Sequence, residues 1–251
     1  LILDDNDIQR LVIAGTENLT SLEMQNSGVT FSSPCPKLQS LKWNGGTLSD
    51  AMFPFLIGDV TTLSKLDVDM SSIAPDFRFP TQLTSLKLTT WSMPVDGALL
   101  MPLTRLQELD IEINHDKTPL DLSGMTTLTK LDGHESPISL IPTSLVECSI
   151  TLRSDTDFSS FTHLTSLGIS MEPEIKVTFP TGLKKLVKGD GELDNTNVGD
   201  VALESLRSIP GHLFTRDELE KLPKTIKKVE GGFYPASLKE CLSEIFPLLE
   251  D

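Results

Sequence analysis

Basic residues are scarce in this chain of 251 residues, which has 21 lysines and arginines against 36 aspartates and glutamates. The resulting formal net charge is -15 at pH 7. Surfaces that bind nucleic acid or an anionic membrane need a basic footprint, which this composition does not provide. We therefore expect no nucleic-acid partner.

Long apolar runs are also absent. The best candidate, residues 51–57, is short and interrupted by Pro54, whereas a membrane-spanning helix needs about 20 apolar residues. We therefore expect no membrane insertion. The sequence begins at Leu1 without an initiator methionine, which leaves open that an N-terminal targeting segment has been removed.

Cysteines are few and scattered. The three residues Cys35, Cys148 and Cys241 lie far apart, so they form neither a disulfide framework nor a metal cluster. We expect no bound metal or cofactor. This cysteine usage favours a reducing compartment and hence the cytoplasm, although the sequence does not distinguish a secreted from a cytoplasmic protein.

Catalytic motifs are missing as well. The chain has no G-x-S-x-G, no phosphate-binding G-x-x-x-x-G-K-[ST], and no histidine pair at metal-ligand spacing. The acidic segment that begins at Asp190 resembles the start of a calcium loop, but Asn195 and Val201 stand where that loop needs glycine and glutamate. We therefore expect no catalytic residues and no enzyme activity.

Leucine, in contrast, is abundant, with 40 of the 251 residues. It recurs in the pattern L-x-x-L-x-L or a close variant, with successive starts 17 to 25 residues apart. The pattern begins at Leu19, Leu38, Leu63, Leu83, Leu106, Leu128, Leu145, Leu164 and Leu183. Weaker matches flank this array at Ile8, Leu203 and Ile226.

The spacing within each repeat predicts a short strand, because the alternating L-x-L positions face one side. A single strand of this kind cannot bury its apolar side, but strands stacked in parallel can. The connections are rich in proline, glycine, serine and threonine, which favours turns and short helices. The sequence therefore predicts an α/β-type solenoid with a parallel sheet on its concave face and a mostly irregular or short-helical convex side.

These repeats resemble those of leucine-rich repeat proteins over about residues 8–232. Four of them begin with an apolar residue and a proline, similar to the P-x-x-L-x-x-L units of bacterial and some protozoan repeats: Phe79-Pro80, Ile141-Pro142, Phe179-Pro180 and Leu222-Pro223. The resemblance implies a non-catalytic scaffold for protein–protein interaction. The alternative is the targeting half of a larger enzyme or effector whose catalytic domain lies outside this chain.

One position departs from the family pattern. Only Asn114 occupies the position of the usual asparagine ladder, so we expect an irregular ladder with serine as a partial substitute. We also expect one domain over residues 1–251, closed by a C-terminal cap over residues 233–251. That cap is predicted to be a helix starting with a capping box at Ser237, and the rival interpretation is a final repeat.

The residues between the core positions are predicted to line the concave face. Its centre is acidic with interleaved lysines, and the candidate partner-binding residues are Asp67, Asp69, Lys87, Thr89, Asp110, Glu112, Asp132 and His134. Two interpretations remain open: cross-strand charge pairs that keep the sheet solvated, or a recognition surface for a basic protein partner. The oligomeric state also remains open.

Overall fold

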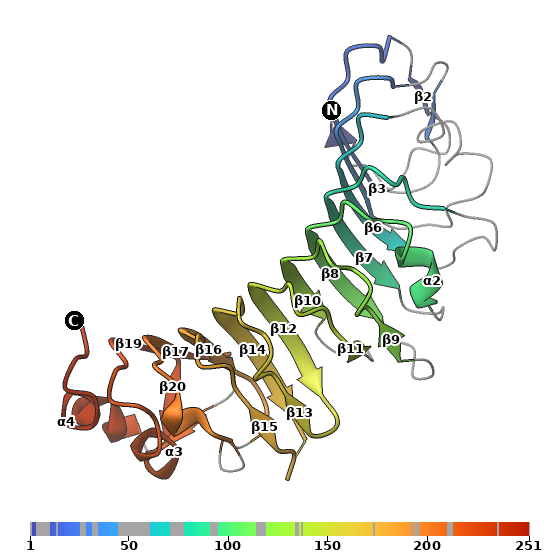
Figure 1. The fold of residues 1–251 in the computed structure, drawn as a ribbon. Helices are drawn as coiled ribbons and strands as arrows, with labels where there is room; N and C mark the ends of the chain where they lie inside the picture. Colours follow the sequence, from blue (N-terminus) through green and yellow to red (C-terminus); the bar gives the residue numbers. More distant parts are fainter. Residues whose placement is uncertain are drawn as a thin grey trace. The chain divides into compact units, whose positions relative to one another are not determined.

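A computed structural model describes most of the chain (Figure 1). The described residues are 2–3, 11–13, 15–25, 29–31, 35–44, 61–70, 78–90, 95–113, 119–133, 136, 138–172, 174–191, 193, 196–209, 213–234 and 236–250. They form two compact units, unit 1 (Leu1–Pro142) and unit 2 (Thr143–Asp251). A single domain over residues 1–251 stays a prediction.

Parallel strands form the main sheet in both units, and each strand comes from one coil of the chain. Unit 1 has the strand order β1-β3-β5-β6-β7-β8-β10, and unit 2 has β12-β14-β16-β17-β19. The strands of unit 1 are β1 (Ile2–Leu3), β3 (Ser21–Gln25), β5 (Ser40–Asn44), β6 (Lys65–Met70), β7 (Ser85–Thr90), β8 (Glu108–Ile113) and β10 (Lys130–Gly133). Those of unit 2 are β12 (Glu147–Leu152), β14 (Ser166–Met171), β16 (Lys185–Lys188), β17 (Ser205–Ser208) and β19 (Lys228–Glu230).

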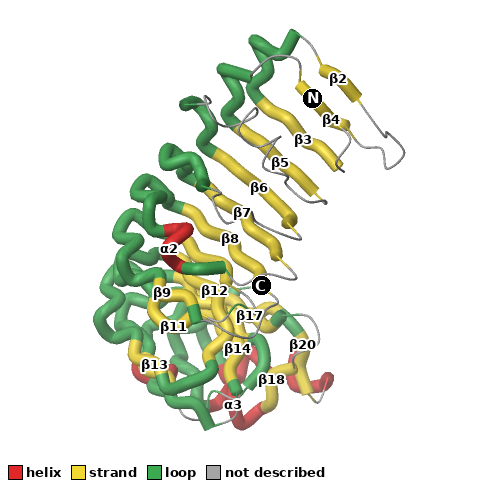
Figure 2. The backbone as a smooth tube through the Cα atoms, turned by 90° about the vertical axis from the view of Figure 1, so that its right-hand side faces the viewer, coloured by secondary structure: helices red, strands yellow, loops and turns green. Residues whose placement is uncertain are grey.

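The segments that connect these strands carry shorter elements, which Figure 2 distinguishes by colour. Within the described ranges, four two-stranded parallel sheets pair β2 (Leu11–Ile13) with β4 (Val29–Phe31), β9 (Leu120–Asp121) with β11 (Ile138–Leu140), β13 (Thr156–Asp157) with β15 (Val177–Thr178), and β18 (Leu213–Thr215) with β20 (Gly232–Tyr234). The helices are α2 (Gly97–Leu100), η1 (Val198–Asp200), α3 (Arg216–Glu220), η2 (Ala236–Cys241) and α4 (Leu242–Ile245). The predicted short-helical or irregular connections are confirmed, whereas the small sheets were not predicted.

The leucines of the repeat form the core. Corresponding residues of neighbouring strands stand in register, and each of the following is at most 2% exposed: Leu41, Leu66, Leu86, Leu109 and Leu131. Parallel stacking satisfies the backbone groups of each strand while its apolar side packs on the next coil. The predicted parallel solenoid is therefore confirmed.

Threonine hydroxyls reinforce the stacking at the turns before β6, β10 and β19. The threonine that precedes the first leucine or isoleucine of a repeat donates to the carbonyl of the equivalent leucine one coil earlier. These hydrogen bonds are Thr62 to Leu38 at 2.8 Å, Thr127 to Leu106 at 2.8 Å and Thr225 to Leu203 at 2.7 Å. The T-L and T-I pairs in the repeats are thus structural residues that satisfy turn carbonyls.

The expected irregular ladder takes the form of single polar side chains in different coils. Ser136 is 2% exposed, accepts from the Ile113 N–H at 3.0 Å and donates to the Ile111 carbonyl at 2.8 Å. In unit 2, Asn197 accepts from the Phe179 N–H at 2.6 Å. A serine therefore does substitute for asparagine, as predicted, while Asn114 lies outside the described residues.

The N-terminal match at Ile8 is corrected by the pairing of the strands. The strand that follows it, β2, pairs with β4 in a two-stranded sheet and not with the main sheet. The main-sheet strand of this region is instead β1, which pairs with β3. The prediction was wrong because β2 has the same L-x-I alternation as a main-sheet strand, and alternation alone does not specify which sheet a strand joins.

The C-terminal segment is helical. Element η2 begins at Ala236, so Ser237 lies inside the helix and not at the predicted N-cap position. The segment's apolar residues Leu238, Leu242 and Ile245 are buried, at most 6% exposed, and Cys241 is half-buried. No main-sheet strand follows β19 among the described residues, so the final-repeat interpretation is not supported. A capping role for residues 233–251 stays a prediction.

Candidate functional site

Strand register brings most of the predicted site residues together in unit 1. One column across β6, β7, β8 and β10 consists of Asp67, Lys87, Asp110 and Asp132. Counted from the N-terminal ends of the strands, this is the second of three outward columns. The first contains Lys65, Glu108 and Lys130, and the third consists of Asp69, Thr89 and Glu112. His134 lies outside the described residues. We call the outward residues of β3 to β10 the unit 1 sheet face.

The unit 1 sheet face carries more acidic than basic side chains. Its columns contain seven carboxylates, Glu23, Asp67, Asp69, Glu108, Asp110, Glu112 and Asp132, and four lysines, Lys42, Lys65, Lys87 and Lys130. The lysines occupy the first two columns, whereas both charged residues of the third column are acidic. The charge therefore becomes more negative towards the C-terminal ends of the strands.

Two ion pairs run between neighbouring strands of this face. Lys42 Nζ lies 2.8 Å from Glu23 Oε1, and Lys87 Nζ lies 2.5 Å from Asp110 Oδ2. Asp67 stands between these two lysines in the register, yet both lysines bond to the acid on their far side. Asp67 thus makes no ion pair with any of the described residues.

Five carboxylates of the face share this lack of an ion pair within the described part of the chain, and one of them, Glu108, is exposed and lies in the first column. We call the other four the acidic set: Asp67, Asp69, Glu112 and Asp132. All four are half-buried, and they occupy two adjacent columns. This arrangement offers acceptor oxygens for a cation or a hydrogen-bond donor that the described residues do not supply.

A hollow of about 440 Å³ opens on the same face. Its charged lining residues are balanced in sign: Lys42, Lys65, Asp67, Lys87, Glu108, Asp110, Lys130 and Asp132. Four predicted site residues line it, namely Asp67, Lys87, Asp110 and Asp132, whereas Asp69, Thr89 and Glu112 do not. The acidic excess of the face therefore lies beside the hollow, in the third column.

The surroundings of Asp67 alter its titration. Partial burial raises the pKa of its carboxyl group, and Lys87 and Lys42 oppose this increase. The pKa of Lys87 is raised in turn by its hydrogen bond to Asp110, and that of Lys42 by its hydrogen bond to Glu23. Each lysine ammonium is thus stabilised by its bonded partner, while Asp67 retains part of its desolvation cost.

We expect Asp67→Asn to raise the melting temperature at pH 7. Because the folded-state pKa of Asp67 is raised, its stability contribution is fully present below the unfolded pKa and is lost as pH rises through the folded pKa. The asparagine side chain does not ionise, so the variant should melt at a higher temperature than the wild-type protein at pH 7. This difference in melting temperature should disappear near pH 3. Thermal melts of both proteins at the two pH values measure this difference, which should stay below about 1 kcal/mol because water reaches the carboxylate.

Asp121→Asn is the matched control, and its expected change in melting temperature at pH 7 has the opposite sign. Hydrogen bonds from the Ser123 hydroxyl and N–H hold the pKa of Asp121 below its usual value. Its contribution is present above the unfolded pKa and is lost as pH falls through the folded pKa, so the variant should melt lower at pH 7. A lower melting temperature for Asp67→Asn at pH 7 would contradict the proposed desolvation cost.

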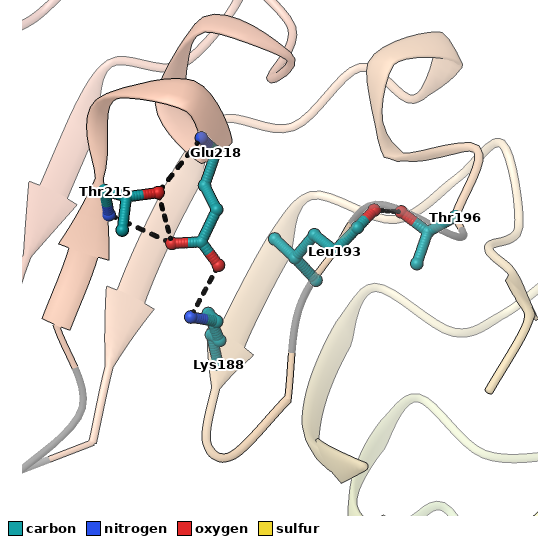
Figure 3. A network of polar contacts seen from close by, with 5 residues as sticks. All are labelled: Lys188, Leu193, Thr196, Thr215 and Glu218. Atoms are coloured by element: carbon teal, nitrogen blue, oxygen red, sulfur yellow. Dashed lines mark hydrogen bonds and ion pairs between the residues drawn. The ribbon is translucent and has the colours of Figure 1, made fainter. Parts of the chain in front are cut away.

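Unit 2 contains a polar network that the sequence analysis missed (Figure 3). Lys188 occupies a core position of β16, and its Nζ lies 2.7 Å from Glu218 Oε1, with both side chains at most 8% exposed. Glu218 also closes a capping box with Thr215 at the start of α3. A lysine at an apolar repeat position and the T-x-x-E spacing were the two available signals.

No group of three or more potential metal ligands occurs among the residues that the structure describes. His163 is exposed, whereas His115, His134 and His212 lie outside those residues. None of the helices in the described ranges combines the length and the apolar character needed to cross a membrane.

Comparisons with known proteins identify the fold. The chain is similar to an internalin of Listeria monocytogenes, with 16% identity and a TM-score of 0.55 over 94% of this chain and 86% of the internalin. It is also similar to a leucine-rich repeat protein of Leptospira interrogans (15% identity, TM-score 0.47, 93% and 72% covered) and to a circular leucine-rich repeat protein (14%, 0.47, 85% and 40%). No family model and no curated protein sequence matches. The similarity to the internalin shows that this chain has the leucine-rich repeat fold.

Proposed function

We propose that this chain is a non-catalytic scaffold that binds a basic segment of a protein partner on the unit 1 sheet face. The proposal rests on the acidic set, whose four carboxylates make no ion pair with the described residues and stand in two registered columns beside a hollow. Lysine or arginine side chains of a partner would supply the missing donors. The net negative charge of the chain also favours a positively charged partner.

The form of the face also supports a binding role. Hydrogen-bonded parallel strands about 4.8 Å apart hold the carboxylates in fixed columns, so little reorganisation is needed on binding. Negative charge on such a rigid surface speeds the encounter with a basic partner and selects its register. We propose neither nucleic acid nor a membrane as a ligand, because the net charge of -15 opposes both.

A charge reversal at Glu112 tests this proposal. Glu112 belongs to the acidic set and makes no ion pair with another described residue, so Glu112→Lys changes the charge without breaking an internal contact. We expect the affinity for a fluorescein-labelled peptide of alternating lysine and serine to fall about tenfold in fluorescence anisotropy. Asp110→Lys should weaken binding further, since it also leaves Lys87 without its bonded partner.

Glu17→Lys is the matched control, because Glu17 is an exposed residue of unit 1 outside the sheet face and the charge change is the same. Binding should also weaken with added salt, as expected for charges in contact with water. An equal loss of affinity in Glu17→Lys and Glu112→Lys would show that only net charge matters. Unchanged binding in Glu112→Lys and Asp110→Lys would place the partner on another surface.

A further inference from the structure

The sheet face of unit 2 has the opposite charge near its C-terminal end. The outward positions of β16, β17 and β19, together with the turn residues directly before them, carry five cations and two acids. The cations form what we call the C-terminal basic patch: Lys184, Lys185, Arg207, Lys227 and Lys228. All five side chains are exposed. This concentration of positive charge is unexpected in a chain with a net charge of -15.

Internal ion pairs neutralise only part of the patch. Lys184 lies 3.5 Å from Glu204, and Lys228 lies 2.7 Å from Glu230. Lys185, Arg207 and Lys227 make no ion pair with any residue in the described ranges. The patch thus presents three cations that the described part of the chain leaves uncompensated.

The cations of the patch lie close enough together to act on one carboxyl group, that of Glu230. The hydrogen bond from Lys228 holds the pKa of the Glu230 carboxyl below its usual value, and the charges of Arg207 and Lys185 lower it further. Cations from three successive strands therefore act on one carboxylate. An acidic side chain from outside, placed at the same end of the face, would experience the same positive field.

The outward residues on the strands before the patch are mostly small. The column that contains Arg207 continues through Val187 to Gly168 and Ser149. A Cβ atom on Gly168 would lie 2.9 Å from the Ser149 hydroxyl oxygen, so a side chain at this position would meet its neighbour. Gly168 is itself buried, so only the half-buried side chains of Ser149 and Val187 project from this column before Arg207.

We propose that the C-terminal basic patch is a second binding surface, which takes an acidic segment of a protein. Arg207 is the central residue, because its planar guanidinium can bind a carboxylate through two parallel hydrogen bonds. Lys185 lies in β16 opposite Ser205, two residues before Arg207, and Lys227 lies in the turn directly before β19. Both add positive charge without a preferred geometry. Two strand spacings cover only about 10 Å, which suits a few carboxylates of one short segment.

An acidic polypeptide fits this patch better than a nucleic acid does. Nucleic acids have a higher density of negative charge than a peptide with spaced carboxylates, and the net charge of -15 repels them more strongly. Glu204 and Glu230 lie beside the cations of the patch and would repel closely spaced phosphates. The patch combines positive and negative positions, which favours a partner with alternating charged and neutral residues.

The test is fluorescence anisotropy of the complete chain with a labelled peptide of alternating glutamate and serine. We expect saturable binding at about 50 mM salt that weakens strongly at about 300 mM. The double variant Lys185→Glu/Arg207→Glu should lower the affinity at least about tenfold. Lys176→Glu is the matched control for the single variant Arg207→Glu, which makes the same charge change, since Lys176 is exposed in unit 2 outside the main-sheet strands. The control should change the affinity less than about twofold.

Other outcomes would overturn the proposal. Melting temperatures of the variants establish that they are folded, so a loss of binding cannot be attributed to unfolding. No binding of the acidic peptide by the folded wild-type chain, or an equal loss in Lys176→Glu, would remove the patch as a site. Tighter binding of duplex DNA than of the peptide would assign the patch to nucleic acid. Self-association in sedimentation that Arg207→Glu abolishes, without peptide binding, would assign it to a second copy of the chain.

Discussion

Replacing Glu218 with alanine is expected to destabilise the folded chain by about 3–5 kcal/mol, because the substitution leaves the Lys188 ammonium buried without its counter-charge. Lys188 is 7% exposed and faces the core of unit 2 from β16, so water cannot replace the lost carboxylate. The Phe214 ring, whose centroid lies 5.7 Å from Lys188 Nζ, offers only weak compensation. Urea unfolding followed by circular dichroism measures the loss.

Part of this loss comes from the end of helix α3. Glu218 Oε2 accepts from the Thr215 N–H at 2.9 Å and completes the capping box, which contributes about 1 kcal/mol in comparable helices. Lys188→Met keeps the capping box intact and should therefore cost less than Glu218→Ala. Comparison of the two single variants separates the cap from the ion pair.

The double variant Lys188→Met/Glu218→Ala provides the decisive measurement. An apolar side chain in place of the buried lysine removes the uncompensated charge, so the double variant should be more stable than Glu218→Ala alone. The four proteins form a cycle whose interaction energy isolates the pair. If the two single losses simply added, the ion pair would contribute nothing and the view of Lys188 as a compensated core charge would be wrong.

Replacing Trp43 with alanine is expected to cost about 3–5 kcal/mol in unit 1. Trp43 is 1% exposed and occupies a core position of β5, as its place in the repeat predicted. Its neighbours in the register are Met24 and Val68, which are fully buried. Removal of the indole would leave a cavity that these side chains can fill only in part, and urea unfolding by circular dichroism measures the cost.

Trp43→Phe serves as the control, because a smaller cavity should cost less. In a solenoid each coil contacts mainly its neighbours, so hydrogen exchange should show the largest loss of protection in β3, β5 and β6. A loss below about 1 kcal/mol for the alanine variant, or protection lost equally in both units, would contradict this description of the core.

The sequence predicted the repeat, the buried positions and the outward columns of the main sheet. The predicted interleaving of lysines with the acids is confirmed by the strand register, in which Lys87 lies between Asp67 and Asp110. This prediction was possible because side chains alternate with a period of two along a strand and equivalent repeat positions stack in parallel. Residues that follow from this local rule, such as Leu66 and Asp110, need no knowledge of distant contacts.

The binding roles of the columns remain proposals, because position in a sheet does not identify a ligand. The charge of the unit 2 face could have been found by extending the same alternation to β16, β17 and β19. Lys185 and Arg207 follow the rule that placed Asp67 and Asp110. The predicted candidate residues end at His134, in unit 1, and therefore did not include the cations of unit 2.

The sequence by itself thus determined which residues are buried in this solenoid and which share a column, because both follow from the period of the strand and of the repeat. Only the tertiary structure decided that Lys87 bonds to Asp110 and leaves Asp67 without an ion pair among the described residues. It also decided that Lys188 meets Glu218, and that β2 joins β4. These contacts depend on the rotamers of long side chains and on the packing of separate coils, which no local pattern specifies.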